Sequence, residues 1–372
     1  MREWTLSGIL AGTEGTLIGG SEPGEIVGFS IDSRTLKKGE VFFAITGENH
    51  DGHNFIPQAI KAGASVIVAS KQQEETPGSV HPAWVCVPDP LLALQQLARW
   101  HRARHHARFL GITGSNGKTT TKEMAAFLFQ EMTETWSTSG NLNNHIGLPL
   151  NLIRIPLSTK IAIMEMGMNH SGEIRFLQGI ARPASGIVTN IGPAHIGNLA
   201  TLENIALAKA EMLENLTPES FAVLPGDDPY LKTLTGKTKA RIWTFGFGSS
   251  CDIRGKDLAL RVDGLSFRVA FQGQDEELRL KLLGQHNALN ALAALGLFFS
   301  QGFSLKEGAR ILQTFQPVAA RMETHEVEGL RLVLDCYNAN PASMKQALDY
   351  LAVWPGRRVA VLGDMRELGA IS

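Results

Sequence analysis

The stretch GITGSNGKTTTKE, residues 111–123, joins an apolar run to a glycine-rich turn and then to a segment that can form a helix. The apolar run FLGIT, residues 109–113, predicts a buried strand, and Lys118 is expected to begin the helix. In such a unit, the backbone N–H groups of the turn and the positive end of the helix can hold phosphate oxygens. A plain β-turn before a helix is the alternative interpretation.

The turn differs from the common phosphate-loop pattern G-x-x-x-x-G-K-[ST] in the place of its first glycine. Counting back from Gly117, that glycine would stand at position 112, which is Ile112. The shift changes which residue makes the tight turn and leaves the cradle itself in place. Lys118 would reach the β- and γ-phosphates, and the hydroxyl of Thr119 or Thr120 would bind Mg²⁺. The sequence therefore predicts ATP binding, although the loop alone does not reveal the reaction.

Strand-like and helix-like segments alternate after this loop. The apolar runs KIAIMEM, 160–166, and GIVTNI, 186–191, predict strands, and helices are expected from about residues 171 and 201. This alternation predicts an α/β fold with a mostly parallel sheet and helices on both faces. Residues 241–283 are strand-rich, with the strand-like runs RIWTFGF, LSFRVAF and ELRLKLL, and predict a β-meander. The segment LGQHNALNALAALGLFFSQG, 283–302, then predicts a long helix.

A chain of 372 residues is too long for one ordinary domain, and the pattern predicts three. Residues 1–84 predict a small α/β domain, whose last stretch, 76–84, is typical of a linker. Residues 85–316 are expected to form the central domain. Residues 317–372 begin a further α/β unit with the strand-like runs GLRLVLD and RRVAVLGDM. One βαβ pair is too little for an open sheet with its own core, so this third domain is expected to be incomplete.

Composition excludes several classes of protein. The net charge of −1 and the pI near 6.8 give no basic surface, so nucleic acid is not expected as the main partner. The N-terminus does not resemble a signal peptide and no apolar run could span a bilayer, which predicts a cytoplasmic protein without membrane insertion. Cys86, Cys251 and Cys336 are scattered, so we expect buried, inert thiols rather than disulfides or a zinc site.

Candidate metal ligands follow the expected strands. Glu165 is the first carboxylate after KIAIM, and His195 follows GIVTNI, so both are expected at the carboxyl edge of the sheet, where ligands bind. They could bind a cation beside the phosphates, although a lone histidine can also be structural. Lys209, in LAKAEM, would repel Mg²⁺ as an ammonium. A role near the metal therefore requires that its amine is modified or contacts phosphate.

The basic end of an amphipathic helix over residues 91–106 carries His101, His105 and His106. Two of these histidines are four residues apart, a spacing that could hold a metal. The alternative is a solvated helix end, where positive charge suits the helix dipole.

Polar residues further along the chain allow more than one role. Asn287 and Asn290 are three apart on one helical face, where they could contact a purine edge or hydrogen-bond between helices. Arg321, in AARMETHE, is expected to be exposed between the second and third domains. Asp335 ends an apolar strand, a place from which a carboxylate can bind a ribose hydroxyl.

Together these segments resemble the ATP-dependent Mur ligases of peptidoglycan synthesis. Residues 111–369 contain, in order, GITGSNGKTTTKEM, GNLNNHIGLPL, EMGMNHSGEI, NIGPAHIGN, AKAEM, GQHNALNALAA, RMETHE, DCYNANPASM and LGDMRELG. The segment DSRTLKKGEVFFAITGENHDGHNF, 32–55, is similar to the UDP-binding domain of this family. Within the family, NNHIGLPL, YNANPASM and LGDMRELG resemble the MurF type, whereas the Asp-Asn-Pro-Arg motif of the MurE type is absent from the sequence.

The resemblance implies a three-domain architecture with a UDP-binding, a central ATP-binding and a Rossmann-like C-terminal domain, and it implies roles for matching residues. The residues that match the segment around the UDP moiety are Ser33, Arg34, Asp51, Gly52 and His53. Those in the segment that faces the muramoyl-peptide are Asn141 and Asn144. Those that match the ATP phosphate loop are Gly114, Ser115, Asn116, Gly117, Lys118, Thr119 and Thr120.

The resemblance also implies the metal and nucleotide ligands. The Mg²⁺ ligands would be Thr119, Glu165, His195 and Lys209, and the catalytic residues Lys118, Lys209 and His195. Lys209 matches a lysine that is carbamylated in the family, and a carbamate is an anion, which removes the conflict with Mg²⁺. Asn287 and Asn290 match adenine-side contacts. Arg321 and Asp335 match ATP contacts from the C-terminal domain.

The implied reaction joins D-alanyl-D-alanine to UDP-N-acetylmuramoyl-tripeptide. The peptide carboxylate attacks the γ-phosphate of ATP, while Lys118 and Mg²⁺, of which two ions are expected, offset the charge. The dipeptide amine then attacks the acyl phosphate. The third residue of the peptide, diaminopimelate or lysine, stays open. A monomer is expected, although the sequence does not determine the oligomeric state.

Relatives continue beyond LGDMRELG with the rest of a Rossmann-like domain, whereas this chain ends at GAIS, so part of the dipeptide and ATP site is expected to be missing. Two other interpretations stay open. One is a folylpolyglutamate synthase-like ligase, which shares the loop and chemistry but lacks a UDP-binding domain. The other is a nucleotide-binding protein without turnover.

Overall fold

The computed structural model describes residues 4–70, 82–194, 196–352 and 354–365. Contacts divide the chain into two compact units, Met1–Ala107 with Thr138–Thr159 and Arg108–Ser137 with Lys160–Ser372. The chain therefore passes between the units three times. None of the helices within the described residues combines the length and apolar character needed to cross a membrane. The division into three domains at the expected boundaries stays a prediction.

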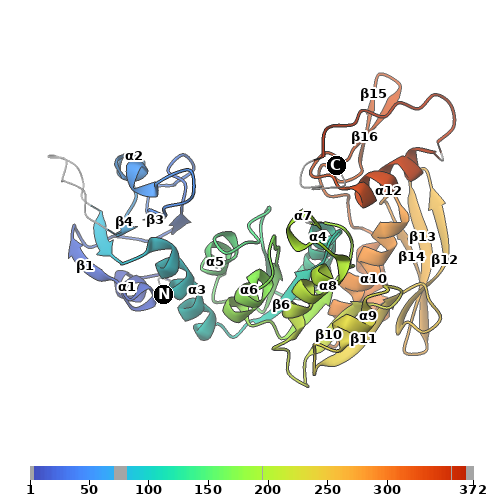
Figure 1. Ribbon diagram of the computed structural model, residues 1–372, viewed down its shortest axis with the longest axis horizontal. Helices are drawn as coiled ribbons and strands as arrows, with labels where there is room; N and C mark the ends of the chain where they lie inside the picture. The colour runs from blue at the N-terminus through green and yellow to red at the C-terminus, as the bar shows by residue number, and fades with distance from the viewer. Residues whose placement is uncertain (1–3, 71–81, 195, 353, 366–372) are drawn as a thin grey trace. The chain divides into compact units, whose positions relative to one another are not determined.

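The first unit contains a five-stranded sheet in the order β1-β5-β4-β3-β2. The strands from β2 to β5 run parallel, and β1 runs antiparallel to β5. Buried Phe42, Ile56, Ile67 and Trp84 form the core between this sheet and α2. The strands are β1 Thr16–Gly19, β2 Gly28–Ser30, β3 Glu40–Phe43, β4 Val66–Ala69 and β5 Ala83–Cys86. The helices are α1 Leu6–Thr13, η1 Gly52–Phe55, α2 Ile56–Lys61, α3 Pro90–Arg104 and α5 Gly147–Leu152 (Figure 1).

The small α/β domain expected near the N-terminus is confirmed, but its last stretch is not a simple linker. Residues 76–81 of that stretch lie outside the described residues. Ala83 and Trp84 belong to β5, which pairs with both β4 and β1. Their apolar side chains are buried in the sheet, and this explains why a segment rich in proline and glycine ends in a strand.

The second unit contains a nine-stranded sheet in the order β14-β13-β12-β11-β10-β9-β6-β8-β7. The strands run parallel from β7 across to β12, and β12, β13 and β14 then form an antiparallel meander. The expected meander is thus confirmed for β13 and β14, whereas β11 belongs to the parallel part, and β12, which was not predicted, is the first strand of the meander. The strands are β6 Arg108–Thr113, β7 Thr135–Ser137, β8 Ile161–Glu165, β9 Ser185–Val188, β10 Phe221–Pro225, β11 Arg241–Gly246, β12 Ile253–Arg261, β13 Gly264–Phe271 and β14 Gln274–Leu280.

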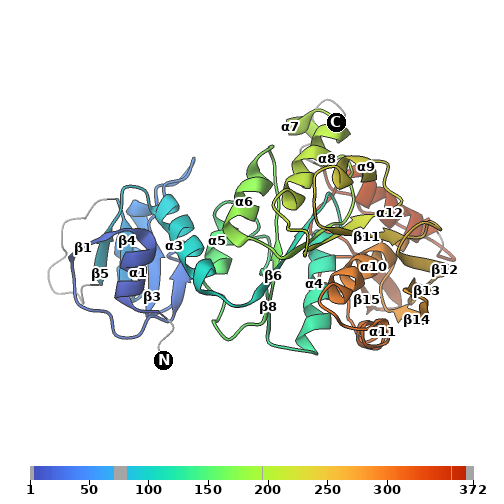
Figure 2. The ribbon, with the colours of Figure 1, turned by 90° about the horizontal axis from the view of Figure 1, so that it is seen from below.

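Helices cover both faces of this sheet. Leu110 and Ile112 of β6 point into a large apolar core with α4 and α10. Gly111, between them, faces the other side, where Met212 of η2 packs against it. Figure 2 shows α4 and α10 on one side of the sheet and α6 and α8 on the other. The alternation along β6 is therefore that of a strand buried on both faces. The helices are α4 Lys118–Gln130, α6 Glu173–Ala181, α7 Ile196–Leu199, α8 Leu202–Ala210, η2 Glu211–Leu213, α9 Leu231–Thr235, α10 Gln285–Phe299 and α11 Leu305–Leu312.

The segment after Pro317 forms a hairpin and a helix, namely β15 Glu323–Val327, β16 Leu330–Leu334 and α12 Pro341–Ala352. Met322 and Tyr350 pack with Leu283 in a small apolar cluster. The expected strand at RRVAVLGDM is wrong, because residues 357–365 form neither strand nor helix. Val359 and Val361 are exposed there, so no neighbouring strand pairs with this apolar run within the described residues.

Candidate active site

The loop of residues 114–117 lies at the end of β6, the third strand from one edge of the nine-stranded sheet. It follows β6 and leads directly into α4. The strand register places Ile112 of β6 beside Glu165 of β8 and Ile187 of β9. The carboxyl ends of these three parallel strands therefore meet at one edge, which is where ligands bind in open α/β sheets.

Two positions of the loop require glycine. Gly114 has a φ of 150°, and a Cβ added there would lie 1.8 Å from Thr189 Oγ1. Gly117 has a φ of 77°, and its Cβ would lie 2.2 Å from Asn290 Oδ1. Ile112, where the common pattern has glycine, is instead a fully buried residue of β6. The departure from the common pattern thus reflects where the strand ends and the turn begins.

The segment after β9 holds the loop in shape. The Ser115 hydroxyl donates to Gly192 O over 2.9 Å and accepts from Gly192 N over 2.8 Å. Asn190 accepts from Asn116 N and donates to Asn116 O, both over 3.0 Å. Thr189 Oγ1 donates to the same carbonyl over 2.6 Å. These bonds fix residues 115 and 116, so the donors that face a ligand come from the start of α4, which has no side-chain cap.

Lys118 is half-buried and folds back over the loop. Its Nζ donates to Gly114 O over 2.9 Å and to Ser115 O over 3.2 Å. Burial lowers the pKa of Lys118, and the nearby Glu165 carboxylate acts in the opposite direction. The ammonium is therefore held within reach of a group that binds in the loop.

Glu165 and Lys209 are buried beside Lys118. Glu165 is the last residue of β8, and Lys209 lies in the last turn of α8. Burial lowers the pKa of Lys209 well below its ordinary value, and the positive charge of Lys118 lowers it further. Three charged side chains from three elements thus share one buried region. His195, the fourth residue expected here, lies outside the described residues.

Residues after Pro317 also reach the loop. Arg321 Nη2 donates to Thr119 Oγ1 over 3.0 Å, and its guanidinium lies 4.3 Å from the centre of the Tyr337 ring. Arg321 is half-buried, so the expectation of an exposed arginine is wrong; the contacts with Thr119 and Tyr337 explain its burial. Burial raises the pKa of Asp335, while a hydrogen bond from Met322 N–H and the charge of Arg321 oppose that shift.

A second contact joins the loop to α12. Asn340 Nδ2 donates to Asn116 Oδ1, and Asn340 Oδ1 accepts from Ser343 N over 3.0 Å at the start of the helix. One amide therefore caps α12 and binds the loop at the same time. Asn340 is the second asparagine of the YNANP motif, and neither of these contacts was predicted from the sequence.

Asn287 and Asn290 are buried in α10, and their amides bind protein groups. Asn287 Nδ2 donates to Leu283 O over 2.8 Å, and Asn290 Nδ2 donates to Asn287 Oδ1 over 3.0 Å. Asn290 Oδ1 accepts from Thr121 Oγ1 of α4 over 3.3 Å. Of the two roles left open above, hydrogen bonding between helices is the one observed. A contact with adenine stays a prediction.

In the first unit, the expected UDP-side residues form two groups. Asp51 Oδ1 lies 2.6 Å from His53 Nδ1, while Ser70 N donates to His53 Nε2 over 3.1 Å, which places the ring proton on Nδ1. Hydrogen bonds from the backbone and ring of His53 lower the pKa of Asp51 to about 2. Gly52 is required because a Cβ would lie 2.6 Å from Ile45 N.

Ser33 and Arg34 lie on another loop of the first unit. The Ser33 hydroxyl is buried and donates to Gln58 Oε1 over 3.0 Å. Arg34 is exposed and forms an ion pair of 2.7 Å with Asp32. Its guanidinium is therefore accessible to a ligand. Binding would break one surface ion pair, and such pairs typically contribute little to stability.

Asn141 and Asn144 precede α5. Asn144 Oδ1 accepts from Gly147 N over 2.8 Å and from Ile146 N over 3.2 Å, so it helps to start this helix. Asn141 is exposed. The structure therefore gives Asn144 a local structural role, and the contact of both residues with a muramoyl-peptide stays a prediction.

The histidines at the end of α3 are not a solvated helix end. His101 and His105 are buried, and their Nε2 atoms lie 2.9 and 3.2 Å from the same carbonyl, Ile155 O. Burial lowers the pKa of His101 to about 4. His106 alone is exposed. Within the described residues, no group of three or more histidine, cysteine or acidic side chains could hold a metal.

The three cysteines differ in exposure, which corrects the expectation that all are buried. Cys251 is buried, Cys86 is partly buried and Cys336 is exposed. Burial raises the pKa of Cys251 to about 11, and Asp227 raises it further, so this thiol is unreactive.

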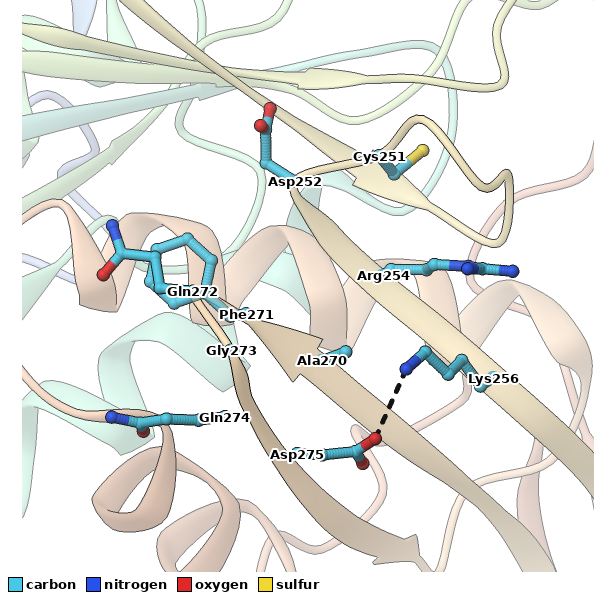
Figure 3. A pocket seen from close by; sticks show the side chains of 10 residues that line it. All are labelled: Cys251, Asp252, Arg254, Lys256, Ala270, Phe271, Gln272, Gly273, Gln274 and Asp275. Atoms are coloured by element: carbon cyan, nitrogen blue, oxygen red, sulfur yellow. Dashed lines mark hydrogen bonds and ion pairs between the residues drawn. The ribbon is translucent and has the colours of Figure 1, made fainter.

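The surface hollow drawn in Figure 3 lies outside the site just described. It has a volume of about 280 Å³ and lies on the meander, between β12, β13 and β14. Its charged rim includes the ion pair of 3.3 Å between Lys256 and Asp275. None of the expected site residues lines it, so it adds nothing to the nucleotide site.

Comparison with known proteins identifies the family. The model of the Mur ligase middle domain matches residues 112–298, that of the Mur ligase family catalytic domain matches 25–102, and that of the Mur ligase glutamate ligase domain matches 320–371. The chain belongs to the Mur ligase family.

Several similar proteins are named as MurF, or by the reaction name of that ligase. A Bacillus subtilis protein named UDP-N-acetylmuramoyl-tripeptide–D-alanyl-D-alanine ligase is 36% identical, over 92% of this chain and 74% of its own. The crystal structure of MurF from Acinetobacter baumannii has a TM-score of 0.91 at 32% identity, over 99% of this chain and 80% of that one. MurF ligase from Thermotoga maritima, in complex with ADP, has a TM-score of 0.82 at 28% identity, over 93% and 79% of the two chains.

Proposed function

We propose that this chain is an ATP-dependent ligase that joins D-alanyl-D-alanine to UDP-N-acetylmuramoyl-tripeptide in the synthesis of peptidoglycan precursors. The observation that carries the proposal is the loop of residues 114–117, which leads into α4 with half-buried Lys118 at its start and buried Glu165 and Lys209 nearby. The names of the relatives supply the two substrates. We also propose a cytoplasmic location and a monomeric enzyme.

The loop suits the phosphates of ATP. Gly114 and Gly117 allow Thr189 and Asn290 to pack directly against the loop backbone, where a Cβ would collide with them, and this packing fixes the shape of the loop. The first N–H groups of α4 have no side-chain cap, and the positive end of the helix attracts the anion. Lys118 currently donates to two loop carbonyls, and its flexible ammonium can turn from them to a phosphate oxygen.

The chain's own residues position the reacting groups. The carboxylate of the bound peptide attacks the γ-phosphate of ATP, the bond to the β–γ bridging oxygen breaks, ADP leaves and an acyl phosphate forms, while Lys118 offsets the negative charge on the transferring group. The amine of the dipeptide then attacks the acyl carbon, phosphate leaves, and an amide bond forms. Arg321 and Asp335 would contact ATP from the C-terminal segment, and Asn287 and Asn290 would lie on the adenine side.

The residues beside the loop fit Mg²⁺. The donor set consists of a buried carboxylate, Glu165, and a hydroxyl, Thr119, and such oxygen ligands are the ones Mg²⁺ prefers. We propose that His195 and modified Lys209 complete the ligands of two ions. When bound, Mg²⁺ supplies positive charge that stabilises the transferring phosphoryl group.

We propose that Lys209 is carbamylated. Lys209 is buried near the positive charge of Lys118, and both burial and this charge lower the pKa of Lys209, which favours the neutral, nucleophilic amine over a second ammonium. The amine can add to the carbon of CO₂ and lose a proton, which gives an anionic carbamate that attracts Lys118 and a cation. Activity is then expected to depend on bicarbonate, and short carboxylic acids should rescue Lys209→Ala. Indifference to both would contradict the carbamate.

The first unit would bind the UDP-linked substrate. Ser33, Arg34, Asp51, Gly52 and His53 would surround the UDP moiety, and Asn141 with Asn144 would face the peptide. The exposed guanidinium of Arg34 suits a diphosphate, because arginine binds phosphate oxygens in a bidentate manner.

Release of phosphate tests the proposal. Purified protein with ATP, Mg²⁺ and both substrates should form ADP, phosphate and the UDP-linked pentapeptide, and omission of D-alanyl-D-alanine should prevent formation of the amide. Lys118→Ala should lower turnover at least about 100-fold without loss of fold. No turnover with retained ATP binding would favour a nucleotide-binding protein without ligase activity. Ligation of glutamate to folate would favour the folylpolyglutamate synthase-like alternative.

A further inference from the structure

The carboxylate of Glu211 lies buried between α8 and α6, and nothing in the proposed chemistry uses it. Glu211 is the first residue of η2 and is 1% exposed. Its Oε1 accepts from Ser171 Oγ over 3.1 Å and from Gly172 N over 2.8 Å, and its Oε2 accepts from Arg175 N over 3.0 Å. Arg175 Nη2 lies 3.5 Å from Oε1. A buried carboxylate with this many donors is held in one orientation.

Glu211 caps α6 from a different element. Gly172, at the N-cap of α6, has no side chain with which to bind the first N–H groups of the helix. The Glu211 carboxylate binds the N–H groups of Gly172 and Arg175 in its place, and its negative charge suits the positive end of the helix. The start of α6 is therefore fixed to the end of α8.

Hydrogen bonds hold both ends of the segment that runs from Met166 to the start of α6. At its first residue, Met166 N donates to Ile112 O over 2.9 Å, and Thr113 Oγ1 donates to Met166 O over 2.9 Å. At its last residues, the bonds to Glu211 hold Ser171 and Gly172. Glu211 itself follows Lys209 by two residues, so one carboxylate connects the segment after Glu165 to the helix end that carries Lys209.

We propose that Glu211 is a positioning residue that holds Glu165 and Lys209 in one arrangement beside the phosphate loop. The inference rests on the proposed function, because it assigns Glu211 a part in the same reaction. Replacing a group that orients a metal ligand without touching the metal typically lowers metal affinity or activity about 10- to 100-fold.

The chain offers a matched pair of variants. Glu211→Gln keeps the size of the side chain, but one of its two terminal atoms becomes an NH₂ group, which cannot accept from the Arg175 or Gly172 N–H. Glu214→Gln is the control, because among the described residues the Glu214 carboxylate hydrogen-bonds to the Arg175 side chain alone, with Nε to Oε2 at 2.7 Å, and is partly exposed. Both variants remove one negative charge beside α6, and only the first disturbs the backbone bonds.

Three measurements test the proposal on the full chain. Hydrogen exchange without ligands should be faster over residues 166–176 in Glu211→Gln and unchanged in Glu214→Gln. Turnover should fall about 10- to 100-fold in Glu211→Gln, and the Mg²⁺ concentration for half-maximal activity should rise. The ¹³C NMR signal of a carbamate formed from labelled bicarbonate should weaken. Glu214→Gln should match the wild type in all three.

The outcomes separate the inference from the proposed function. A Glu211→Gln variant that melts at a lower temperature but keeps the wild-type turnover and Mg²⁺ dependence would show a structural role only and would overturn the inference. If the variant does not fold, Glu211→Asp, whose shorter side chain cannot reach all three donors, must show the same changes. If the wild type itself has no ligase turnover, the proposed function fails, and unchanged hydrogen exchange in the variant would still overturn the inference.

Discussion

Positions 114 and 117 of the loop require glycine, because a single added Cβ atom would collide with a neighbouring side chain. Both glycines combine a positive φ with a backbone that lies against another side chain, Thr189 in one case and Asn290 in the other. The sequence predicted a phosphate loop because the glycines, lysine and threonines stand in the right order. It did not predict that Asn290 limits the space at Gly117, because that contact joins residues far apart along the chain.

Gly117→Ala is expected to damage the loop. The added Cβ would lie 2.2 Å from Asn290 Oδ1 at a φ of 77°, and strain of this kind costs about 1–3 kcal/mol. The affinity for ATP, measured by calorimetry, should fall at least about 10-fold, together with the free energy of unfolding. Gly140→Ala is the control, since Gly140 has a φ of 58° and nothing within 4 Å of the added atom. Unchanged ATP affinity in Gly117→Ala would contradict the assigned role of the loop.

A preceding apolar run separates the site residues that could be predicted from those that could not. Glu165 ends such a run, and Lys118 follows one after a glycine-rich turn, so their place near the carboxyl ends of the strands could be deduced from the sequence. Glu211 is one of many glutamates in helical segments, and its sequence neighbours give no sign that it is 1% exposed. His101 was expected to be exposed to solvent, because a basic helix end is typical of a protein surface.

At the scale of elements, the end of α3 should respond to pH. Burial lowers the pKa of His101 from 6.5 to about 4, so below pH 6.5 the unfolded chain binds a proton that the folded chain excludes. Stability should therefore fall as the pH drops from 6.5 towards 4, by about 2 kcal/mol at pH 5. His101→Gln removes this titration and can still donate to Ile155 O.

The loss of melting temperature between pH 7 and pH 5, measured by calorimetry, should be smaller in His101→Gln than in the wild type. Exposed His106 provides the control, because His106→Gln leaves the buried ring in place. An equal loss in all three proteins would show that another group causes the acid sensitivity.

The N-terminus of α12 carries a second prediction at this scale, because Asn340 both caps the helix and binds Asn116. Asn340→Asp keeps an oxygen for Ser343 N but cannot donate to Asn116, whereas Asn340→Ala loses both bonds. Both variants should weaken ATP binding about 3- to 10-fold, and only Asn340→Ala should also lose about 1 kcal/mol of stability. Binding and melting measurements on the two variants check this. Wild-type affinity in Asn340→Asp would mean that the contact with Asn116 does not support the loop.

Elements were predicted well where apolar residues form a clear period. The strand β6 and the helices α4 and α10 were expected at nearly their observed bounds. The strand β12 was missed because its sequence, IRGKDLALR, is rich in charge, and because its register shifts between Lys256 and Ala259, where Asp257 has a φ of 52°. The opposite error occurred at residues 357–365, where an apolar run has no neighbouring strand to pair with among the described residues.

At the scale of the whole molecule, the order of segments along the chain does not predict which residues belong to the same compact unit. Residues 138–159 lie between two strands of the nine-stranded sheet, yet they belong to the first unit, where Ile155 O meets His101 and His105. Such a return of the chain leaves no signal in composition or periodicity. The three-part organisation predicted from sequence agrees with the three Mur ligase domain models that match the chain in order, whereas the contacts group the same residues into two compact units.

This organisation predicts that the two substrates stabilise different parts of the molecule. ATP would bind the second unit, and a UDP compound the first, because their expected ligands lie on separate units. In scanning calorimetry, ATP with Mg²⁺ at about 100 times its Kd should stabilise only one transition, by about 2.7 kcal/mol, and UDP-N-acetylmuramoyl-tripeptide only the other. Lys118→Ala should abolish the first shift and keep the second. If either ligand alone raised both transitions equally, the assignment of one substrate to each unit would be wrong.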